Sequence, residues 1–231
     1  MGKTPMGNVP MGNVPMDNVP IGDIRIENIV TSGTFSLDGG TWDLENNVWI
    51  VGNDREVIVI DPAHDAAQIA EAVKGRTVTA ILLTHAHDDH IRSVQDFARL
   101  VNAPPISLNP ADRMLWDVLF PNVAPDNEVT DGDTFEVAGA ILRAIHTPGH
   151  TPGSTCYYLE SETTLFSGDT LFNGGPGATG RTFSDFPTII DSIRDRLLTL
   201  PPEVTVLTGH GGSTTIGAEA PHLAEWVARG Y

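Results

Sequence analysis

The chain has 231 residues, of which 40% are hydrophobic, so it can bury a sizeable core without disulfides. Its formal net charge of -17, from 30 acidic residues against 13 Lys and Arg, repels phosphate backbones and anionic lipids. No apolar run approaches the length of a membrane span, no secretory signal is recognised, and Cys156 is the only cysteine. We therefore expect a cytoplasmic monomer or homodimer that acts on a small molecule, not on nucleic acid or membrane.

The first residues are repetitive. Residues 6–20 repeat the unit MGNVP with one change, and proline at every fifth position prevents a continuous helix. Glycine and asparagine between the prolines supply little apolar surface to bury. We predict a low-complexity, disordered tail over residues 1–23 and one α/β domain over residues 24–231.

From residue 24 onward, short Val- and Ile-rich runs alternate with segments of helical periodicity. The runs predict strands over 24–31, 47–51, 56–61, 78–84, 134–137, 140–146, 155–159, 163–167 and 204–208. The periodic segments predict helices over 65–74, 91–102, 111–120, 187–200 and 221–229.

A dense group of metal-binding side chains follows the predicted strand 78–84. Residues 84–90 read THAHDDH. His85 and His87 can point to the same side of an extended segment and share one metal, whereas Asp89 and His90 lie on the turn that opens the next helix. This spacing favours two metals over one, although Asp88 or Asp89 could instead only cap that helix. Imidazole and carboxylate ligands suit zinc, iron or manganese.

Three later segments also place a ligand-type residue directly after a predicted strand. His150 lies in TPGHTPGS, Asp169 in SGDT and His210 in TGHGG. Convergence of such strand ends would bring these side chains to one cleft. His64, His146 and His222 lie outside these segments, and we interpret them as structural or surface residues.

In this order, THAHDDH, TPGHTPGS, FSGDTLF and TGHGG resemble the motifs of the metallo-β-lactamase superfamily, over about residues 24–215. The resemblance implies an α/β fold, the αββα four-layer sandwich, with two mixed β-sheets flanked by helices. It also implies two divalent metal ions, zinc first and iron or manganese as alternatives, and Asp89 as the catalytic residue that orients a metal-bridging hydroxide. The implied ligands are His85, His87 and His150 for one metal, Asp89, His90 and His210 for the other, and Asp169 as the bridge.

Within this family, Asp169 stands where some β-lactamases have a cysteine ligand, which favours the glyoxalase II-like branch. The resemblance then implies hydrolysis of a small-molecule thioester. A Gly-rich loop, residues 173–182, follows Asp169. Arg181 in this loop is a candidate for binding a substrate carboxylate, and an exposed arginine or one paired with Asp185 is the competing interpretation.

Other activities on the same scaffold stay open. A persulfide dioxygenase would use one iron held by two histidines and the aspartate, and a lactonase or β-lactamase-like hydrolase would use both metals. The chain ends about 20 residues after His210. We therefore expect no helical domain of the kind that helps eukaryotic glyoxalase II to hold glutathione, which leaves the thiol carrier open.

Overall fold

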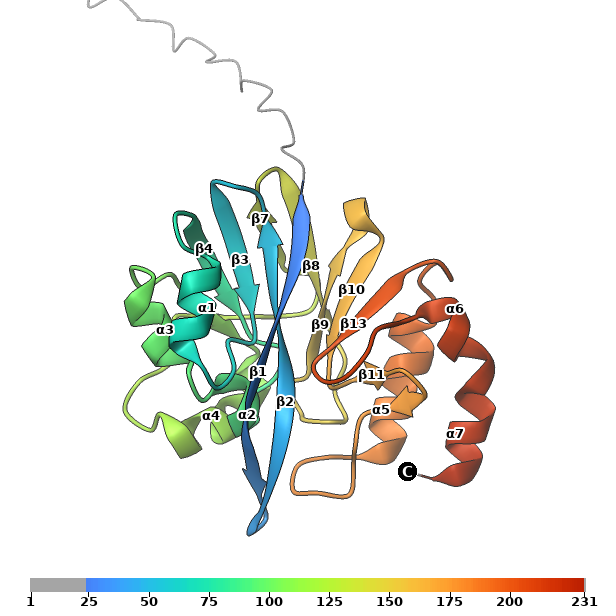
Figure 1. The fold of residues 1–231 in the computed structure, drawn as a ribbon. Helices are drawn as coiled ribbons and strands as arrows, with labels where there is room; N and C mark the ends of the chain where they lie inside the picture. The colour runs from blue at the N-terminus through green and yellow to red at the C-terminus, as the bar shows by residue number, and fades with distance from the viewer. Residues whose placement is uncertain (1–23, 231) are drawn as a thin grey trace, which may run out of the picture.

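The computed structural model describes residues 24–230, so the predicted tail over residues 1–23 and Tyr231 lie outside the described residues. Two six-stranded sheets stack face to face, and helices cover the outer face of each sheet (Figure 1). The predicted four-layer α/β fold is confirmed. Among the described residues, no helix combines the length and the apolar character needed to cross a bilayer.

The first sheet starts with a long antiparallel hairpin and continues with parallel strands. Val57 and Val59 of its third strand pack on the outer helices, whereas Ile58 and Ile60 pack between the sheets. This alternation is the period of a strand that is buried on both faces. The strands, in spatial order, are β1 (Arg25–Leu37), β2 (Gly40–Gly52), β3 (Glu56–Ile60), β4 (Thr77–Leu82), β5 (Ile106–Leu108) and β6 (Asn127–Glu128).

The second sheet is antiparallel except for one parallel pair, β10 with β13. Because parallel strands end at the same edge, the segments that follow β10 and β13 emerge side by side. The strands, in spatial order, are β14 (Thr214–Thr215), β13 (Thr205–Thr208), β10 (Thr164–Gly168), β9 (Thr155–Leu159), β8 (Ala140–His146) and β7 (Thr134–Val137); a separate pair is β11 (Leu171–Phe172) with β12 (Gly175–Pro176).

The helices divide between the two outer faces, as Figure 1 shows. Helices of the first half pack with the first sheet around Phe97 and Trp116, and those of the second half pack with the second sheet around Trp226. The helices are α1 (Ala66–Ala72), α2 (Asp88–Ile91), α3 (Val94–Leu100), α4 (Arg113–Leu119), α5 (Phe186–Ser192), α6 (Ile216–Glu219) and α7 (Leu223–Arg229).

The structure differs most from the sequence prediction in the first hairpin. The predicted strands stop at residue 31 and restart at residue 47, but β1 and β2 continue to Leu37 and Gly40. Their turn is Asp38-Gly39, with φ of 51° and 79°. These positive φ values are those of the tight turn for which Asp-Gly is a strong signal. The Ser-, Gly- and Thr-rich composition of residues 32–41 concealed this extension.

One glycine marks where the two sheets meet at the edge described next. Gly168 ends β10 with φ of 50°, and a Cβ atom there would overlap the side chain of Thr84, which follows β4. The end of β10 therefore lies directly against the end of the β4 segment. This close approach requires a residue without a side chain.

We predict that Gly168→Ala lowers the free energy of unfolding more than Gly132→Ala. Both glycines have positive φ, 50° and 88°, but nothing would lie within 4 Å of a Cβ atom at Gly132. Gly132→Ala is the control, and it should lower the free energy of unfolding by about 1 kcal/mol because of the backbone conformation alone. Gly168→Ala should cost a further 1–3 kcal/mol, roughly, for the overlap with Thr84. Urea unfolding of the metal-free proteins measures the difference, and equal losses would contradict the close approach.

Candidate metal centre

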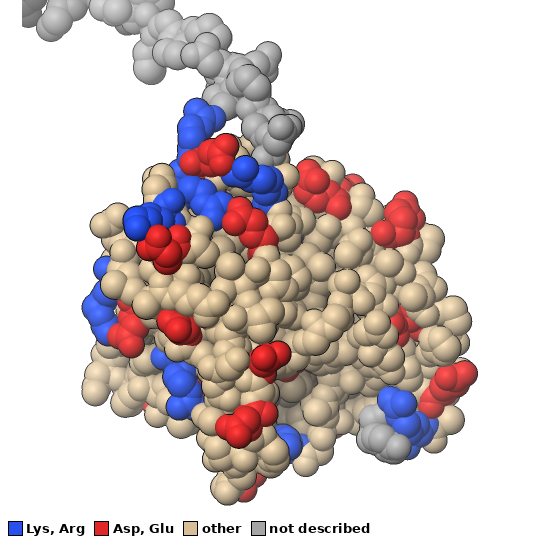
Figure 2. Space-filling view, viewed as in Figure 1, with Lys and Arg blue, Asp and Glu red and all other residues tan. Residues whose placement is uncertain are grey.

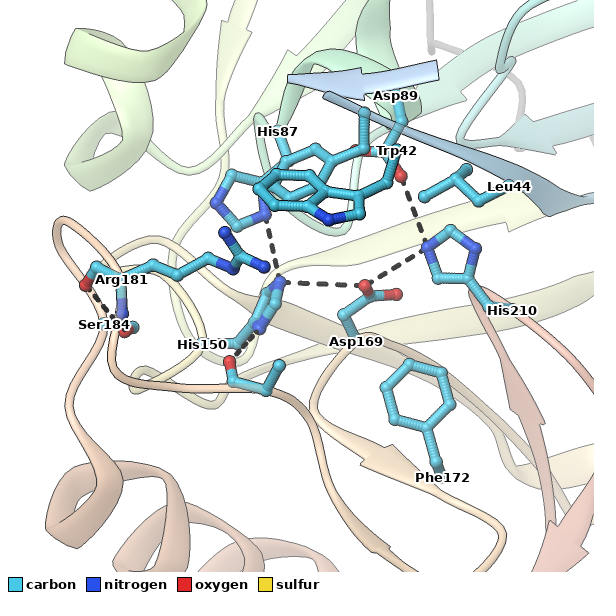
Figure 3. Close-up of a pocket in the computed structure, with 12 residues that line it drawn as sticks. Trp42, Leu44, His87, Asp89, His150, Asp169, Phe172, Arg181, Ser184 and His210 are labelled. Carbon is cyan, nitrogen blue, oxygen red and sulfur yellow. Dashed lines mark hydrogen bonds and ion pairs between the residues drawn. The ribbon is translucent and has the colours of Figure 1, made fainter. Parts of the chain in front are cut away.

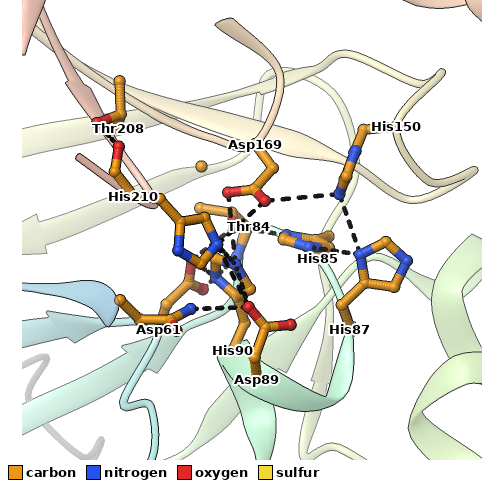
Figure 4. Close-up of polar contacts among 12 residues, drawn as sticks. Asp61, Thr84, His85, His87, Asp89, His90, His150, Asp169, Thr208 and His210 are labelled. Carbon is orange, nitrogen blue, oxygen red and sulfur yellow. Dashed lines mark hydrogen bonds and ion pairs between the residues drawn. The ribbon is translucent and has the colours of Figure 1, made fainter. Parts of the chain in front are cut away.

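All the predicted ligand residues lie together at one edge of the sandwich (Figure 4). Each comes from a segment that follows a strand or opens a helix, so rigid elements fix its backbone. His85 and His87 follow β4, Asp89 and His90 lie in α2, His150 lies in the loop after β8, and Asp169 and His210 follow β10 and β13.

His85, His87 and His150 form the first group. The Nδ1 atom of His87 lies 3.1 Å from Nε2 of His85 and 3.0 Å from Nε2 of His150. Burial lowers the pKa of His85 well below its usual value and that of His87 to about 3, so both rings are neutral at pH 7. Neutral imidazole nitrogens that face one point are ligands for a cation such as zinc.

Asp89, His90 and His210 form the second group. The Nε2 atoms of His90 and His210 lie 3.2 Å apart, and Oδ2 of Asp89 lies 3.4 Å and 3.3 Å from them. Burial alone would lower the pKa of both histidines, but nearby carboxylates outweigh it, chiefly Asp89 for His90 and Asp169 for His210. The pKa of His90 rises well above its usual value and that of His210 to about 10. This group therefore stabilises positive charge, from protons or from a divalent cation.

Asp169 lies between the two groups. Its Oδ2 atom is 3.3 Å from Nε2 of His210 and 3.6 Å from Nε2 of His150, and its Oδ1 atom is 3.4 Å from Nε2 of His90. Oδ1 is buried without a hydrogen-bond partner among the described residues. A buried carboxylate oxygen without a partner is costly, and a cation held by the surrounding nitrogens would satisfy it. The arrangement therefore fits a divalent metal.

Hydrogen bonds fix how the rings face the centre. Except for His87, each ligand-type histidine uses Nδ1 as a donor to an oxygen and directs Nε2 to the site. Such bonds set the tautomer and the ring orientation of metal-binding histidines. They join His85 to Thr84 Oγ1 (3.1 Å), His90 to Asp61 Oδ2 (2.9 Å), His150 to the Ala178 carbonyl (2.8 Å) and His210 to the Glu45 carbonyl (2.7 Å).

Asp61 is a site residue that the sequence analysis missed. It accepts hydrogen bonds from the Thr84 backbone N–H (2.7 Å), the Thr84 hydroxyl (2.6 Å) and His90 Nδ1 (2.9 Å). Asp61 also lies close enough to His85 and His90 that the three side chains could together bind a metal ion. Because its oxygens are already occupied, we interpret it as the residue that orients His90. An aspartate at the end of a buried apolar strand was the available signal.

Asp112 is a second missed residue, and it joins the two loops that carry the first group. Its carboxylate accepts from the backbone N–H of Ala86 (3.0 Å) and Gly153 (2.6 Å) and from the Thr151 hydroxyl (2.7 Å). Ala86 lies between two of the histidines, and Thr151 follows the third. Nothing local in the sequence indicates this role, because it depends on contacts between distant segments.

The candidate centre opens into a cavity of about 290 Å³ (Figure 3). Phe35, Trp42 and Leu44 of the first hairpin line the cavity, and Phe172 lies across it from Trp42 (Figure 3). The sequence analysis missed these residues together with the hairpin extension. The wall is mainly apolar, as expected for a small-molecule site.

Arg181 lies at the same cavity, from the Gly-rich loop. Its guanidinium is 4.1 Å from the centre of the Trp42 ring and 5.7 Å from that of Phe35. It is not paired with Asp185, which instead caps α5 by accepting from the Thr188 N–H. The neighbouring Thr182 donates its backbone N–H (3.0 Å) and hydroxyl (2.6 Å) to Asp38 at the hairpin turn. The hairpin and the loop thus hold each other over the cavity.

The remaining histidines differ in their distance from the centre. His146 contacts the Pro152 carbonyl (2.9 Å) and supports the turn that contains His150, whereas His222 pairs with Glu225 at the surface. His64 is closer to the centre than we expected. It contacts Asn46, which in turn contacts Asp89.

A second groove lies at the opposite end of the molecule, near the start of β1. Figure 2 shows several Lys and Arg side chains gathered there, next to acidic ones. Arg25, Lys74 and Arg76 line the groove, and each pairs with a carboxylate. Paired charges and the lack of metal-ligand geometry distinguish this groove from the candidate centre.

We predict that Asp112→Asn destabilises the metal-free protein by about 1–3 kcal/mol, because an amide cannot accept at both positions and leaves a buried donor unpaired. Asp117→Asn is the matched control, since the Asp117 side chain is 42% exposed and pairs only with Arg113 at the surface. Urea unfolding should show little change for the control. Chelator competition should show zinc affinity lowered about tenfold or more for Asp112→Asn alone. Equal behaviour of both variants would refute a role in joining the loops.

Comparisons with known proteins agree with this geometry. A profile described as the metallo-beta-lactamase superfamily matches residues 41–210. The hydroxyacylglutathione hydrolase GloC of Haemophilus influenzae is 30% identical over 189 residues, which cover 76% of this chain and 89% of GloC.

Two solved structures share both the fold and a comparable identity. BLEG-1, a B3 metallo-beta-lactamase, has a TM-score of 0.72 and 31% identity, covering 85% of this chain and 99% of BLEG-1. TTHA1623 in a di-iron-bound form has a TM-score of 0.66 and 30% identity, covering 82% of this chain and 96% of that protein. Because the profile and these proteins match most of the chain, including the candidate centre, this chain belongs to the metallo-β-lactamase superfamily of metal-dependent hydrolases.

Proposed function

We propose that this chain hydrolyses small-molecule thioesters and that its centre holds two divalent cations, zinc first and iron or manganese as alternatives. The position of Asp169 carries the proposal, because its carboxylate lies between two complete ligand groups. His85, His87 and His150 would hold one cation, and Asp89, His90 and His210 the other. Cations held there would polarise the thioester carbonyl and lower the pKa of water from about 16 toward 7.

Asp89 is the residue that we assign to proton handling. Its Oδ2 atom faces His90 and His210, whereas Oδ1 takes no hydrogen bond from the described residues (Figure 4). Asp89 also lines the cavity. Oδ1 can therefore accept the proton of an attacking water and later pass it to the departing thiolate. In the metal-free centre His90 and His210 hold the pKa of Asp89 far below its usual value, against the effect of burial, so the carboxylate is ionised at neutral pH.

The cavity walls would bind the rest of the substrate. Phe35, Leu44 and Phe172 offer apolar surface for alkyl groups and limit the access of bulk water. Arg181 is stacked on Trp42 and forms no salt bridge with the described residues, although its charge also acts on Asp38 at the hairpin turn, so it can receive a carboxylate of the substrate. A thioester that carries an anionic group suits this pairing of apolar walls with one fixed cation.

The relatives support this choice without deciding it. GloC is named as a hydroxyacylglutathione hydrolase, which is a thioesterase. BLEG-1 is named as a lactamase, and TTHA1623 was solved with two irons. A lactam substrate and iron are therefore the alternatives that the assays must separate. A mononuclear persulfide dioxygenase is a further alternative, because its single iron would leave the second ligand group idle.

Metal analysis of the purified protein, paired with hydrolysis of S-lactoylglutathione, tests the proposal. We expect about two zinc, iron or manganese ions per chain and loss of thioester absorbance. His87→Ala should lose metal and turnover together. One iron per chain, with oxygen uptake on a glutathione persulfide and no thioester hydrolysis, would establish the dioxygenase instead. Cleavage of nitrocefin without thioester hydrolysis would establish the lactamase.

We predict that Arg181→Ala raises KM for an anionic thioester by about tenfold, the loss expected for one hydrogen bond to a charged group. A neutral thioester of similar size should be affected much less, and Arg181→Lys should recover only part of the loss because a lysine does not stack or bind bidentately. Arg113→Ala is the control, since Arg113 pairs with Asp117 at the surface. An equal rise in KM for both substrates would contradict recognition of the anion.

A further inference from the structure

The backbone at His64 adopts a conformation that costs free energy. His64 lies in the loop between β3 and α1 with φ of 54°, in the left-handed region that glycine tolerates best. Loops can usually place a glycine at such a position without loss. A strained histidine that lies near a functional centre therefore points to a use for its side chain.

Strand β1 leaves space for this side chain. A Cβ atom at Gly33 would overlap the imidazole of His64, so the ring lies flat against the glycine backbone. Burial lowers the pKa of His64, which keeps the ring neutral at pH 7. The ring therefore carries a single N–H, and its direction depends on the neighbouring acceptor.

That acceptor is Asn46 of β2. Nε2 of His64 lies 2.7 Å from Oδ1 of Asn46, and Nδ2 of Asn46 lies 3.0 Å from Oδ2 of Asp89. The ionised Asp89 can only accept, so the amide must turn its nitrogen toward Asp89 and its oxygen toward His64. His64 must then donate from Nε2. Asn46 is 0% exposed, so in the intact protein neither bond competes with bulk water.

We propose that His64 and Asn46 are positioning residues that hold the carboxylate of Asp89, with Oδ2 at the second ligand group and Oδ1 facing the cavity. This inference rests on the proposed two-cation centre. Without the hydrogen bond from His64, the Asn46 amide can rotate about its side chain. The Asp89 carboxylate then loses the donor that fixes its plane, and both ligation by Oδ2 and proton transfer at Oδ1 weaken.

Three variants separate this role from a structural one. His64→Gly removes the donor and relieves the strained backbone, which offsets the cost of leaving Oδ1 of Asn46 unpaired, so the urea midpoint of the metal-free protein should change little. His64→Asn tolerates positive φ but is too short to reach Asn46. His64→Gln places an amide nitrogen near the former position of Nε2 and can donate to Asn46 again.

Zinc affinity, measured by chelator competition on the metal-free proteins, is the decisive readout. We expect one of the two zinc ions, the one at the Asp89 group, to bind about tenfold less tightly in His64→Gly and His64→Asn, with the other ion unchanged and His64→Gln close to the wild type. Asn46→Ala should show the same loss, and adding His64→Gly to it should cause no further loss. Turnover of S-lactoylglutathione should follow the affinity of the ion at the Asp89 group.

Two results would overturn the inference. Wild-type affinity for both ions in His64→Gly would show that the contact does not act on Asp89. Equal weakening of both ions together with a lower unfolding midpoint would show a role in folding only. Failure of the proposed function is seen separately, as a wild-type protein that binds fewer than two ions or does not hydrolyse the thioester.

Discussion

Burial of ionisable side chains at one edge of the sandwich is the constraint on which the rest of the structure depends. Taking carboxylates and imidazoles out of water is unfavourable unless each finds a partner. At this edge most of the partners are the groups themselves, with Asp169 among the nitrogens of three histidines, while Oδ1 of Asp169 and Nε2 of His87 have no hydrogen-bond partner among the described residues. Hydrogen bonds to the Nδ1 atoms of four of the histidines hold that arrangement, because they fix the orientation of the rings.

The sandwich meets this constraint because several strands end at the same edge. The segments after β4, β10 and β13 leave well-packed sheets, so their first residues have little freedom. Asp61 and Asp112 then connect segments that the sheets alone would not align. Both are buried carboxylates that accept several N–H or O–H groups, which suits a role in fixing loops. The metal-binding geometry is therefore a property of the whole edge and not of one motif.

The sequence was informative about the candidate metal ligands and less informative about the residues that hold those ligands in position. His85, His87 and their partners could be found because histidine and aspartate recur directly after apolar strands. Asp112 and Asn46 could not, because their roles arise from contacts with distant segments and their local sequence is ordinary. The extension of the first hairpin was missed although Asp38-Gly39 is a recognisable turn, since Ser, Gly and Thr around it favour a loop.

The residues that would carry out the chemistry and those that would select the substrate come from different segments of the chain. The ligand groups come from strand ends that the two packed sheets hold in place, whereas the cavity walls come from the hairpin tip and the Gly-rich loop. These two segments are joined by Thr182 with Asp38 and by Arg181 with Trp42. Because they contribute little to the core, many of their side chains can change, whereas the Ala178 carbonyl that orients His150 and the Phe35 ring that packs on His87 are tied to the metal site. Proteins that share this centre can therefore differ in substrate, and specificity in this chain must be sought in the contacts between hairpin and loop.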